Sequence, residues 1–204
     1  MDLQTLFFLG PSGSGKGTQV KKVQEYLEKC DSQREVIELN LGKLFRQFWK
    51  EGGYVENLSR NVMLKGDLQP SFLQINLWTN YIIKNLKGNE HLLIDGTPRR
   101  LTDLEAWKAA IDFFERPNPK LIFIHISKEE SIKRLLHRAE LSENPRPEDK
   151  DIVLIENRYE WFKESVVPVI DAMRKNSVFT VLEINGEQDV DIVKTDILKS
   201  LGWQ

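Results

Sequence analysis

The chain has 204 residues, of which 40% are hydrophobic and 29% are charged, and its formal net charge at pH 7 is -2. This length allows a single domain with a sizeable core, and a charge so close to zero argues against nucleic acid or an anionic membrane as the main partner. A single cysteine, an N-terminal apolar run too short for a signal peptide and the lack of any run of roughly 18 apolar residues lead us to expect a cytoplasmic protein.

Five short apolar runs predict buried parallel strands, because they are rich in Ile, Leu, Val and Phe and lack a clean alternation with polar residues. They lie at residues 3–9, 35–39, 91–95, 121–126 and 178–184. Apolar residues at helical spacing separate them, as in Val20, Val23 and Leu27 after the first run. Alternating strands and helices predict an α/β fold, a five-stranded parallel sheet flanked by helices on both faces.

Two stretches interrupt this alternation. Residues 42–86, between the second and third predicted strands, are long and helical in pattern. Residues 140–151 are polar and contain prolines, so they are predicted to form a loop. Taken alone, such a polar stretch is most simply a solvated connection.

The first predicted strand leads into Gly10-Pro-Ser-Gly-Ser-Gly-Lys16, which has the spacing of a P-loop. Its glycines let the backbone curl around phosphate with the N–H groups pointing inward, and the following helix adds the positive end of its dipole. Lys16 is predicted to reach the β and γ phosphates of a nucleotide. The alternative is a flexible turn with an exposed lysine, which the apolar strand before it and the amphipathic helix after it disfavour.

The position after Lys16 departs from the usual P-loop. A hydroxyl there normally ligates Mg²⁺, but this chain has Gly17, and Thr18 comes one residue later. Asp95 ends a predicted buried strand beside the loop, where it would meet Mg²⁺ through water; a turn cap is the alternative. We expect Mg²⁺ to bind with the nucleotide, held mainly by phosphates and water, with Asp95 and Thr18 as its protein contacts.

Three motifs stand in order along the chain. The first is Gly-Lys-Gly-Thr-Gln at 15–19, and the second is Ile-Asp-Gly-Thr-Pro-Arg-Arg at 94–100. The third is a set of four arginines: Arg134, Arg138, Arg146 and Arg158. Together these motifs resemble the adenylate kinase and UMP/CMP kinase family, whose lid arginines the third set matches in number, order and approximate spacing. The likeness covers nearly the whole chain.

The resemblance implies a P-loop nucleotide kinase fold with two mobile flaps. A core of residues 1–41, 87–138 and 152–204 would carry a helical monophosphate-binding flap at 42–86 and a short lid at 139–151. Longer lids in the family sometimes bind zinc, but this stretch has no Cys or His, so no zinc is expected. The implied partners are ATP and a nucleoside monophosphate, and the implied state is a monomer.

Phosphoryl transfer between two polyanions requires positioning and charge neutralisation rather than a protein nucleophile. Arginine suits this task because its planar fork binds two phosphate oxygens at once. The resemblance implies a catalytic set of Lys16, Arg99, Arg138, Arg146 and Arg158. It implies an ATP-binding set of Gly13, Ser14, Gly15, Lys16, Gly17, Thr18, Arg134 and Gly186. It implies a monophosphate-binding set of Leu41, Gly42, Arg46, Gly96, Arg99 and Asp103.

Four positions depart from the family pattern on the acceptor side. Leu41 replaces a base-facing Thr or Ala, Lys43 replaces an acid, and Thr97 replaces an aromatic residue. Asp103 stands where adenylate kinases have Gln and UMP/CMP kinases have Asn. An ionised carboxylate only accepts hydrogen bonds, so Asp103 suits the two donors of guanine better than adenine N1. At the start of a predicted helix it could instead point to solvent.

The favoured function is direct in-line transfer of the γ-phosphoryl group of Mg·ATP to AMP. The alternatives are another acceptor (GMP, UMP, CMP or a deoxynucleotide), a nucleotide-binding regulatory module without turnover, and a P-loop kinase for a non-nucleotide metabolite. The retained Lys16, Asp95 and arginines argue against the regulatory module, and the two glycine-containing motifs argue against the metabolite kinase. Elsewhere we expect the tryptophans to pack in the core or in an interface, His125 to lie in the core, and Arg100 and Arg116 to lie on the surface.

Overall fold

The computed structural model describes residues 1–203, and these contain a five-stranded parallel sheet with the strand order β2-β3-β1-β4-β5. All five predicted strands are confirmed, with small shifts at their ends. Their bounds are β1 Thr5–Leu9, β2 Val36–Asn40, β3 His91–Asp95, β4 Lys120–His125 and β5 Thr180–Asn185.

Helices connect every strand to the next, which confirms the predicted α/β class. The stretch 42–86 is helical as expected and forms most of α2, α3 and α4. A π-helical turn at Phe162–Val166 joins α7 to α8. The helix bounds are α1 Lys16–Cys30, α2 Leu41–Phe48, α3 Tyr54–Leu64, α4 Ser71–Asn85, α5 Leu101–Phe113, α6 Lys128–Leu141, α7 Ile152–Trp161, α8 Val167–Lys175 and α9 Val190–Ser200.

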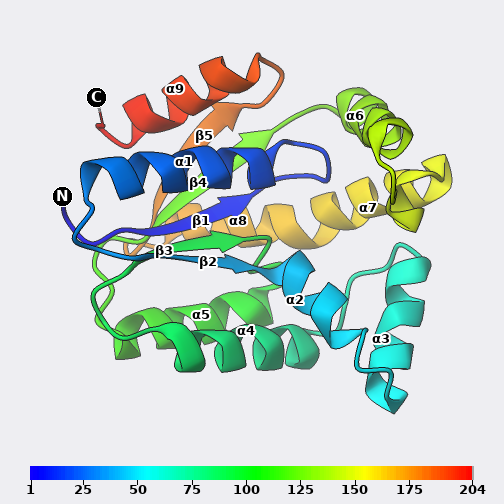
Figure 1. Ribbon diagram of the computed structural model, residues 1–204, viewed down its shortest axis with the longest axis horizontal. Coiled ribbons are helices and arrows are strands. Elements are labelled where there is room, and N and C mark those ends of the chain that lie inside the picture. The colour runs from blue at the N-terminus through cyan, green and yellow to red at the C-terminus, as the bar shows by residue number, and fades with distance from the viewer. Residues whose placement is uncertain (204) are drawn as a thin grey trace.

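Helices cover both faces of the sheet, with α1 and α9 on one face and α4, α5 and α8 on the other (Figure 1). The central strand β1 serves both layers, because successive side chains of a strand point to opposite faces. Leu6 and Phe8 pack with α1 and α9, whereas Phe7 and Leu9 pack with the opposite layer. This burial on both faces explains why the strand reads as a continuous apolar run.

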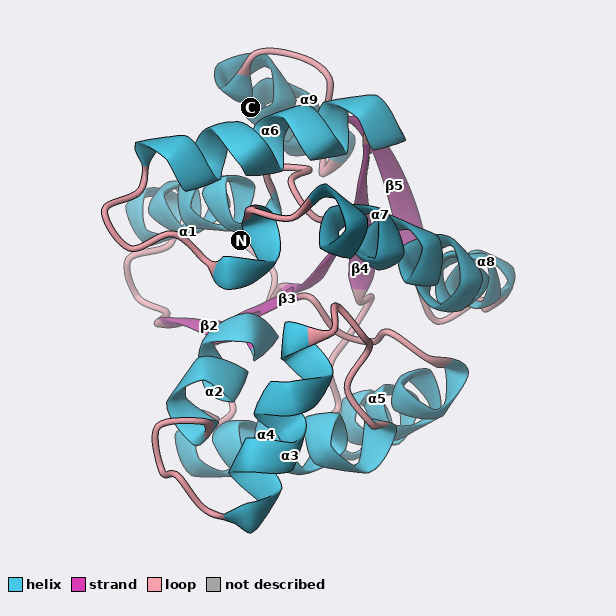
Figure 2. Cartoon of the chain, turned by 90° about the vertical axis from the view of Figure 1, so that its right-hand side faces the viewer, coloured by secondary structure: helices cyan, strands magenta, loops and turns pink. Residues whose placement is uncertain are grey.

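The carboxyl ends of the strands open between two groups of helices. Figure 2 shows α6 on one side of these strand ends and α2 and α3 on the other. Ligands of open α/β sheets bind in the crevice outside the carboxyl ends of the strands. We therefore expect the ligand-binding residues in the segments that follow β1, β2 and β3.

The polar stretch 140–151 is not entirely a loop. Helix α6 continues to Leu141, and a 3-10 turn occupies Pro147–Asp149. The extension is consistent with the helix-favouring Ala139, Glu140 and Leu141 at the end of α6. Within residues 1–203, no helix combines the length and the apolar character that crossing a membrane requires.

Arg116 was predicted at the surface, and the structure shows that this was wrong. Its side chain is 5% exposed. Its Nε donates to Thr5 Oγ1 at 2.8 Å, and its Nη2 donates to the carbonyl oxygens of Gln4 and Glu90 at 2.9 and 2.7 Å. Arg116 therefore ties together the chain segments that enter β1 and β3. Three partners far from it in sequence decide this position.

Three further expectations concern side chains near the sheet. Arg100 is half-buried rather than on the surface, because its Nη1 donates to the carbonyl oxygen of Gln69 at 2.8 Å. His125 is exposed rather than in the core, since it is the last residue of β4. Trp78 and Trp107 are confirmed as core residues; both are 1% exposed, and their rings stack with centroids 3.9 Å apart.

Candidate active site

The loop between β1 and α1 passes very close to the neighbouring strand. A Cβ atom built on Gly10 would lie 2.2 Å from the carbonyl oxygen of Ile124 in β4, and the backbone at Gly10 has φ +153°. Both features require glycine at the point where the loop leaves the strand. The loop then turns into α1, whose first residue is Lys16.

The side chain of Lys16 folds back over this loop. Its Nζ donates to the carbonyl oxygens of Gly10 and Pro11, both at 2.8 Å, and to Ser14 Oγ at 3.3 Å. Burial lowers the pKa of Lys16 to about 8, although the nearby Asp95 works in the opposite direction. A partly desolvated ammonium beside a glycine-rich loop at a helix N-terminus is suited to bind a phosphate group.

Asp95 ends β3 beside the loop. Its Oδ2 accepts from Asn40 Nδ2 at 2.8 Å, and a Cβ atom built on Gly17 would lie 3.8 Å from the same oxygen. Burial raises the pKa of Asp95, while Lys16 and Arg99 lower it. Mg²⁺ that binds with a nucleotide keeps several waters and takes one or two carboxylates. The environment of Asp95, with the exposed Thr18 on the same cavity wall, fits such a hydrated ion.

Arginines from separate segments converge beyond the loop. Asp149, which is 1% exposed, accepts from Arg138 Nε at 2.9 Å through Oδ2 and from Arg158 Nη1 at 2.9 Å through Oδ1. A second bond joins Arg138 Nη2 to the same Oδ2. Asp149 thus joins α6, the 3-10 turn and α7 at one point, and it fixes the position of two guanidinium groups.

Arg99 lies between α7 and the end of β3. Its Nε donates to the carbonyl oxygen of Gly96 at 2.6 Å, and its Cζ lies 5.5 Å from the centroid of the Trp161 ring. Burial lowers the pKa of Arg99 to about 10, and the like charge of Arg158 acts in the same direction. A buried cation next to another cation favours a bound anion, because an anion would offset both the lost hydration and the repulsion.

The larger of two adjoining cavities has a volume of about 750 Å³ and is strongly cationic. Six arginines and four lysines line it, against three carboxylates, so it suits a polyanionic ligand. Its cationic lining residues are Lys16, Lys21, Lys22, Lys43, Arg46, Arg99, Arg134, Arg138, Arg146 and Arg158.

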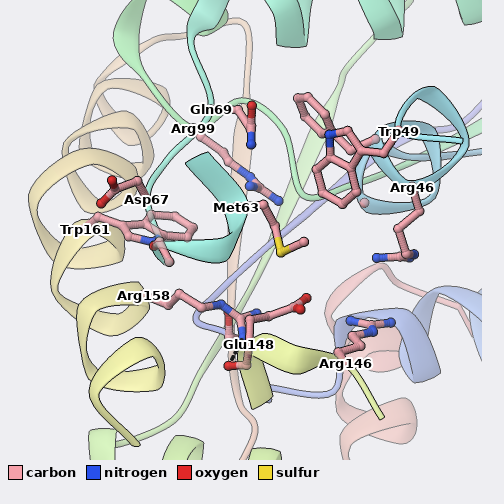
Figure 3. Close-up of a pocket in the computed structure, with 14 residues that line it drawn as sticks. Arg46, Trp49, Met63, Asp67, Gln69, Arg99, Arg146, Glu148, Arg158 and Trp161 are labelled. Carbon is pink, nitrogen blue, oxygen red and sulfur yellow. Dashed lines mark hydrogen bonds between the residues drawn. The ribbon is translucent and has the colours of Figure 1, made fainter. Parts of the chain in front are cut away.

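The smaller cavity has a volume of about 140 Å³ and lies toward α2 and α3. Figure 3 shows Arg46 and Arg146 facing each other on one side of it and Trp161 on the other side. Its uncharged lining includes Phe45, Trp49, Met63, Gly66 and Gln69. Four arginines line both cavities and mark where they meet: Arg46, Arg99, Arg146 and Arg158.

The structure brings most of the predicted site residues to these cavities. All five predicted catalytic residues line the larger cavity, as do Gly42, Arg46, Gly96 and most of the predicted ATP-binding set. Arg134 also lines the larger cavity, and its Nε donates to Glu130 Oε1 at 2.6 Å. Ser14 and Gly186 line neither cavity. Ser14 is 2% exposed behind Lys16, and the N–H of Gly186 donates to the carbonyl oxygen of His125 at 2.9 Å.

Two predicted monophosphate-binding residues lie outside both cavities. Leu41 is fully buried in a cluster with Phe45 and Leu73, so its side chain faces neither cavity, although the resemblance places it where a base-facing residue stands. Asp103 is also 0% exposed, which contradicts the alternative that it points to solvent. Its Oδ2 accepts from the backbone N–H groups of Arg99 and Arg100 at 3.1 and 3.0 Å. The carboxylate therefore caps α5 and fixes the backbone of the adjacent loop.

Sequence reasoning missed several residues that line or support the site. Asn40 lines the larger cavity and contacts Asp95, and its position at the end of β2 is a usable signal. Asp149 lies behind the cavity in the Arg-Pro-Glu-Asp segment, where an acid among arginines is a weaker signal. Met63, Asp67 and Gln69 carry no signal of their own, because only the packing of α3 and of the α3–α4 loop brings them to the cavity.

Comparison with known proteins gives a consistent result. A family model described as "Adenylate kinase" matches residues 8–178. The chain is 30% identical over 197 residues to an "Adenylate kinase" of Prochlorococcus marinus (strain NATL1A), which covers 97% of this chain and 98% of that protein. It is also 29% identical over 198 residues to a "Uridylate kinase" of Saccharomyces cerevisiae (strain ATCC 204508 / S288c), covering 96% of this chain and 89% of the relative.

Proposed function

The chain belongs to the adenylate kinase family and is a nucleoside monophosphate kinase, and we propose that it transfers the γ-phosphoryl group of Mg·ATP to AMP, giving two ADP. The curated relatives include adenylate kinases that align over nearly their whole length, which supports AMP as acceptor. The uridylate kinase relative leaves UMP as the second candidate.

One observation carries the proposal: Arg46, Arg99, Arg146 and Arg158 line both cavities. A donor polyphosphate in the larger cavity and an acceptor monophosphate in the smaller one would place their reacting phosphates among these arginines. The acceptor oxygen is already ionised, so the protein need not supply a strong base. Concentrated positive charge at the junction stabilises the charge on the phosphoryl group in flight.

The donor side would be held by the loop that contains Lys16. Its backbone N–H groups and the Lys16 ammonium bind the β and γ phosphates, and Arg138 and Arg146 close over the transferring group. Arg134 lies over the donor base. Mg²⁺, when bound, neutralises phosphate charge, and Asp95 and Thr18 would hold it through its water shell.

The acceptor side would be held by Arg46 and Arg99 at the phosphate, with Arg158 at the transferring group. The base would occupy the end of the smaller cavity lined by Phe45 and Met63, because flat bases pack well against apolar and aromatic side chains. Residues 42–86 would act as the acceptor flap and 139–151 as the lid, excluding water during transfer. We also propose that the protein is a monomer and that it acts in the cytoplasm.

The test is ADP formation from Mg·ATP with AMP, GMP, UMP and CMP, each measured to saturation. The proposal expects the highest kcat/KM with AMP. A higher value with another monophosphate would overturn the choice of AMP and leave the phosphotransferase intact. Lys16→Met is the control: it should fold with the parent circular dichroism spectrum and lose turnover, since the loop then lacks its charge. ADP formation by Lys16→Met within a few fold of the parent would overturn the role of the loop.

A further inference from the structure

Trp161 lies where three segments meet: α7, the α3–α4 loop and the loop after β3. The proposed reaction requires these segments to keep fixed positions relative to one another. It is the last residue of α7, and its side chain lines the smaller cavity. Its indole Nε1–H donates to the carbonyl oxygen of Gly66 at 3.0 Å, and its ring lies below the Arg99 guanidinium. The ring thus contacts the α3–α4 loop and the loop after β3, while its own helix carries Arg158 one turn earlier.

Gly66 is seated tightly against α7. It is buried, has φ +74°, and a Cβ atom built there would lie 3.3 Å from the carbonyl oxygen of Leu154. The α3–α4 loop therefore lies close to Leu154 of α7 and is hydrogen-bonded to Trp161. The positive φ favours glycine at this position of the loop, and the Cβ of any other residue would press on Leu154.

The helix itself changes geometry at this point. A π-helical turn begins at Phe162, directly after Trp161, and π-turns inside helices occur frequently at functional sites. The Tyr159 hydroxyl donates to the carbonyl oxygen of Ile126 at 3.1 Å, which anchors the same turn of α7 to the end of β4. Trp161 is consequently presented from a fixed helix to two loops that carry acceptor-side residues.

We propose that Trp161 is a positioning residue for the acceptor monophosphate: its ring holds the Arg99 guanidinium in place, and its N–H holds the α3–α4 loop on α7. This inference rests on the proposed function, because it assumes that the smaller cavity takes the acceptor. The two contacts are separable. Phenylalanine keeps a ring below Arg99 and loses the N–H, whereas leucine loses both.

The experiment measures acceptor and donor affinity separately in Trp161→Phe and Trp161→Leu. Loss of one hydrogen bond should raise the KM for the acceptor roughly fivefold in Trp161→Phe. Loss of the cation–π contact as well should raise it about twentyfold in Trp161→Leu. The KM for ATP should stay within about twofold of the parent in both variants, because the α3–α4 loop lines only the smaller cavity and the proposed partner of Arg99 is the acceptor phosphate.

Trp203→Phe is the matched control, since Trp203 stacks on Tyr26 at the far end of α1 with centroids 5.5 Å apart. It makes the same chemical change away from the cavities and should leave both KM values unchanged. Gly66→Ala tests the contact from the other side. It should raise the acceptor KM about as much as Trp161→Phe does, because the new Cβ would press on Leu154 and the positive φ disfavours alanine, while the ring below Arg99 is kept.

Calorimetric titration with AMP, GMP, UMP or CMP alone, without ATP, separates this inference from the proposed function. Weaker monophosphate binding in Trp161→Leu than in the parent supports the inference, whether or not the parent shows turnover. Absence of turnover in the parent would overturn only the proposed function. A lower melting temperature with unchanged acceptor affinity would show a purely structural role and overturn the inference. Equal losses of ATP and monophosphate affinity would overturn it too. Where Trp161→Leu does not fold, the same outcomes are read from Trp161→Phe.

Discussion

Raising the pH from 7 to 9 should weaken ATP binding, because the Lys16 ammonium of the free protein loses its proton over this range. Burial lowers its pKa to about 8. Asp95 raises this pKa, whereas the like charges of Arg99, Arg158 and Arg138 lower it further. A bound polyphosphate places negative charge against the ammonium and raises the pKa of Lys16 again. Binding at or above pH 8 must therefore take up a proton, and affinity falls as the pH rises.

The magnitude follows from the fraction of free protein whose Lys16 is charged. With a pKa of about 8, that fraction is about 0.9 at pH 7, about one half at pH 8 and about 0.1 at pH 9. The Kd for ATP should therefore rise about tenfold between pH 7 and pH 9. The phosphates of ATP do not contribute over this range, because the second pKa of a phosphate group is near 6, about one unit below it.

Isothermal titration calorimetry with ATP at pH 7, 8 and 9, in two buffers of different ionisation enthalpy, checks this. At pH 8 the heats in the two buffers should differ by the uptake of about half a proton for each ATP bound. Lys16→Arg is the control, since a guanidinium stays charged throughout and its Kd should not change with pH. A parent Kd that stays constant from pH 7 to pH 9, with heats independent of the buffer, would refute the argument from burial.

Three further predictions concern other parts of the site. Gly10→Ala should lower the melting temperature more than Gly88→Ala: both glycines have positive φ, but only the Cβ at Gly10 would strike a carbonyl oxygen, at 2.2 Å. Overpacking of this kind costs about 1–3 kcal/mol, and equal shifts in melting temperature would contradict it. Arg138→Ala should lower kcat by on the order of 10³-fold, more than it raises the acceptor KM; an effect limited to KM would assign Arg138 to ground-state binding. Asp149→Asn should lower the free energy of unfolding by about 1.5–3 kcal/mol in urea unfolding, because it removes the charge between two arginines, of which Arg138 is partly exposed. The exposed pair partner Asp171, changed to Asn, should cost about 1 kcal/mol or less, so equal losses would show that burial of Asp149 adds nothing.

The strands, the phosphate loop and the family can all be predicted from the sequence alone. The strands were readable because burial on both faces leaves a continuous apolar run, and the loop because its glycine spacing records a local backbone path. The arginines were readable only as a set in order with the other motifs. The strands and the loop are patterns of neighbouring residues. The arginines form a pattern of motifs whose order and spacing along the chain match those of the family.

The direction in which individual side chains point depends on the three-dimensional packing of the chain. Leu41 and Asp103 align with base-contacting residues, yet one packs in a small core and the other caps α5. Arg116 looked like any surface arginine until Gln4, Thr5 and Glu90 were seen to surround it. The hydrogen bonds of Arg116 join residues 26 to 112 positions apart. No local pattern encodes them, because the environment of a side chain is set by whichever segments the fold brings beside it.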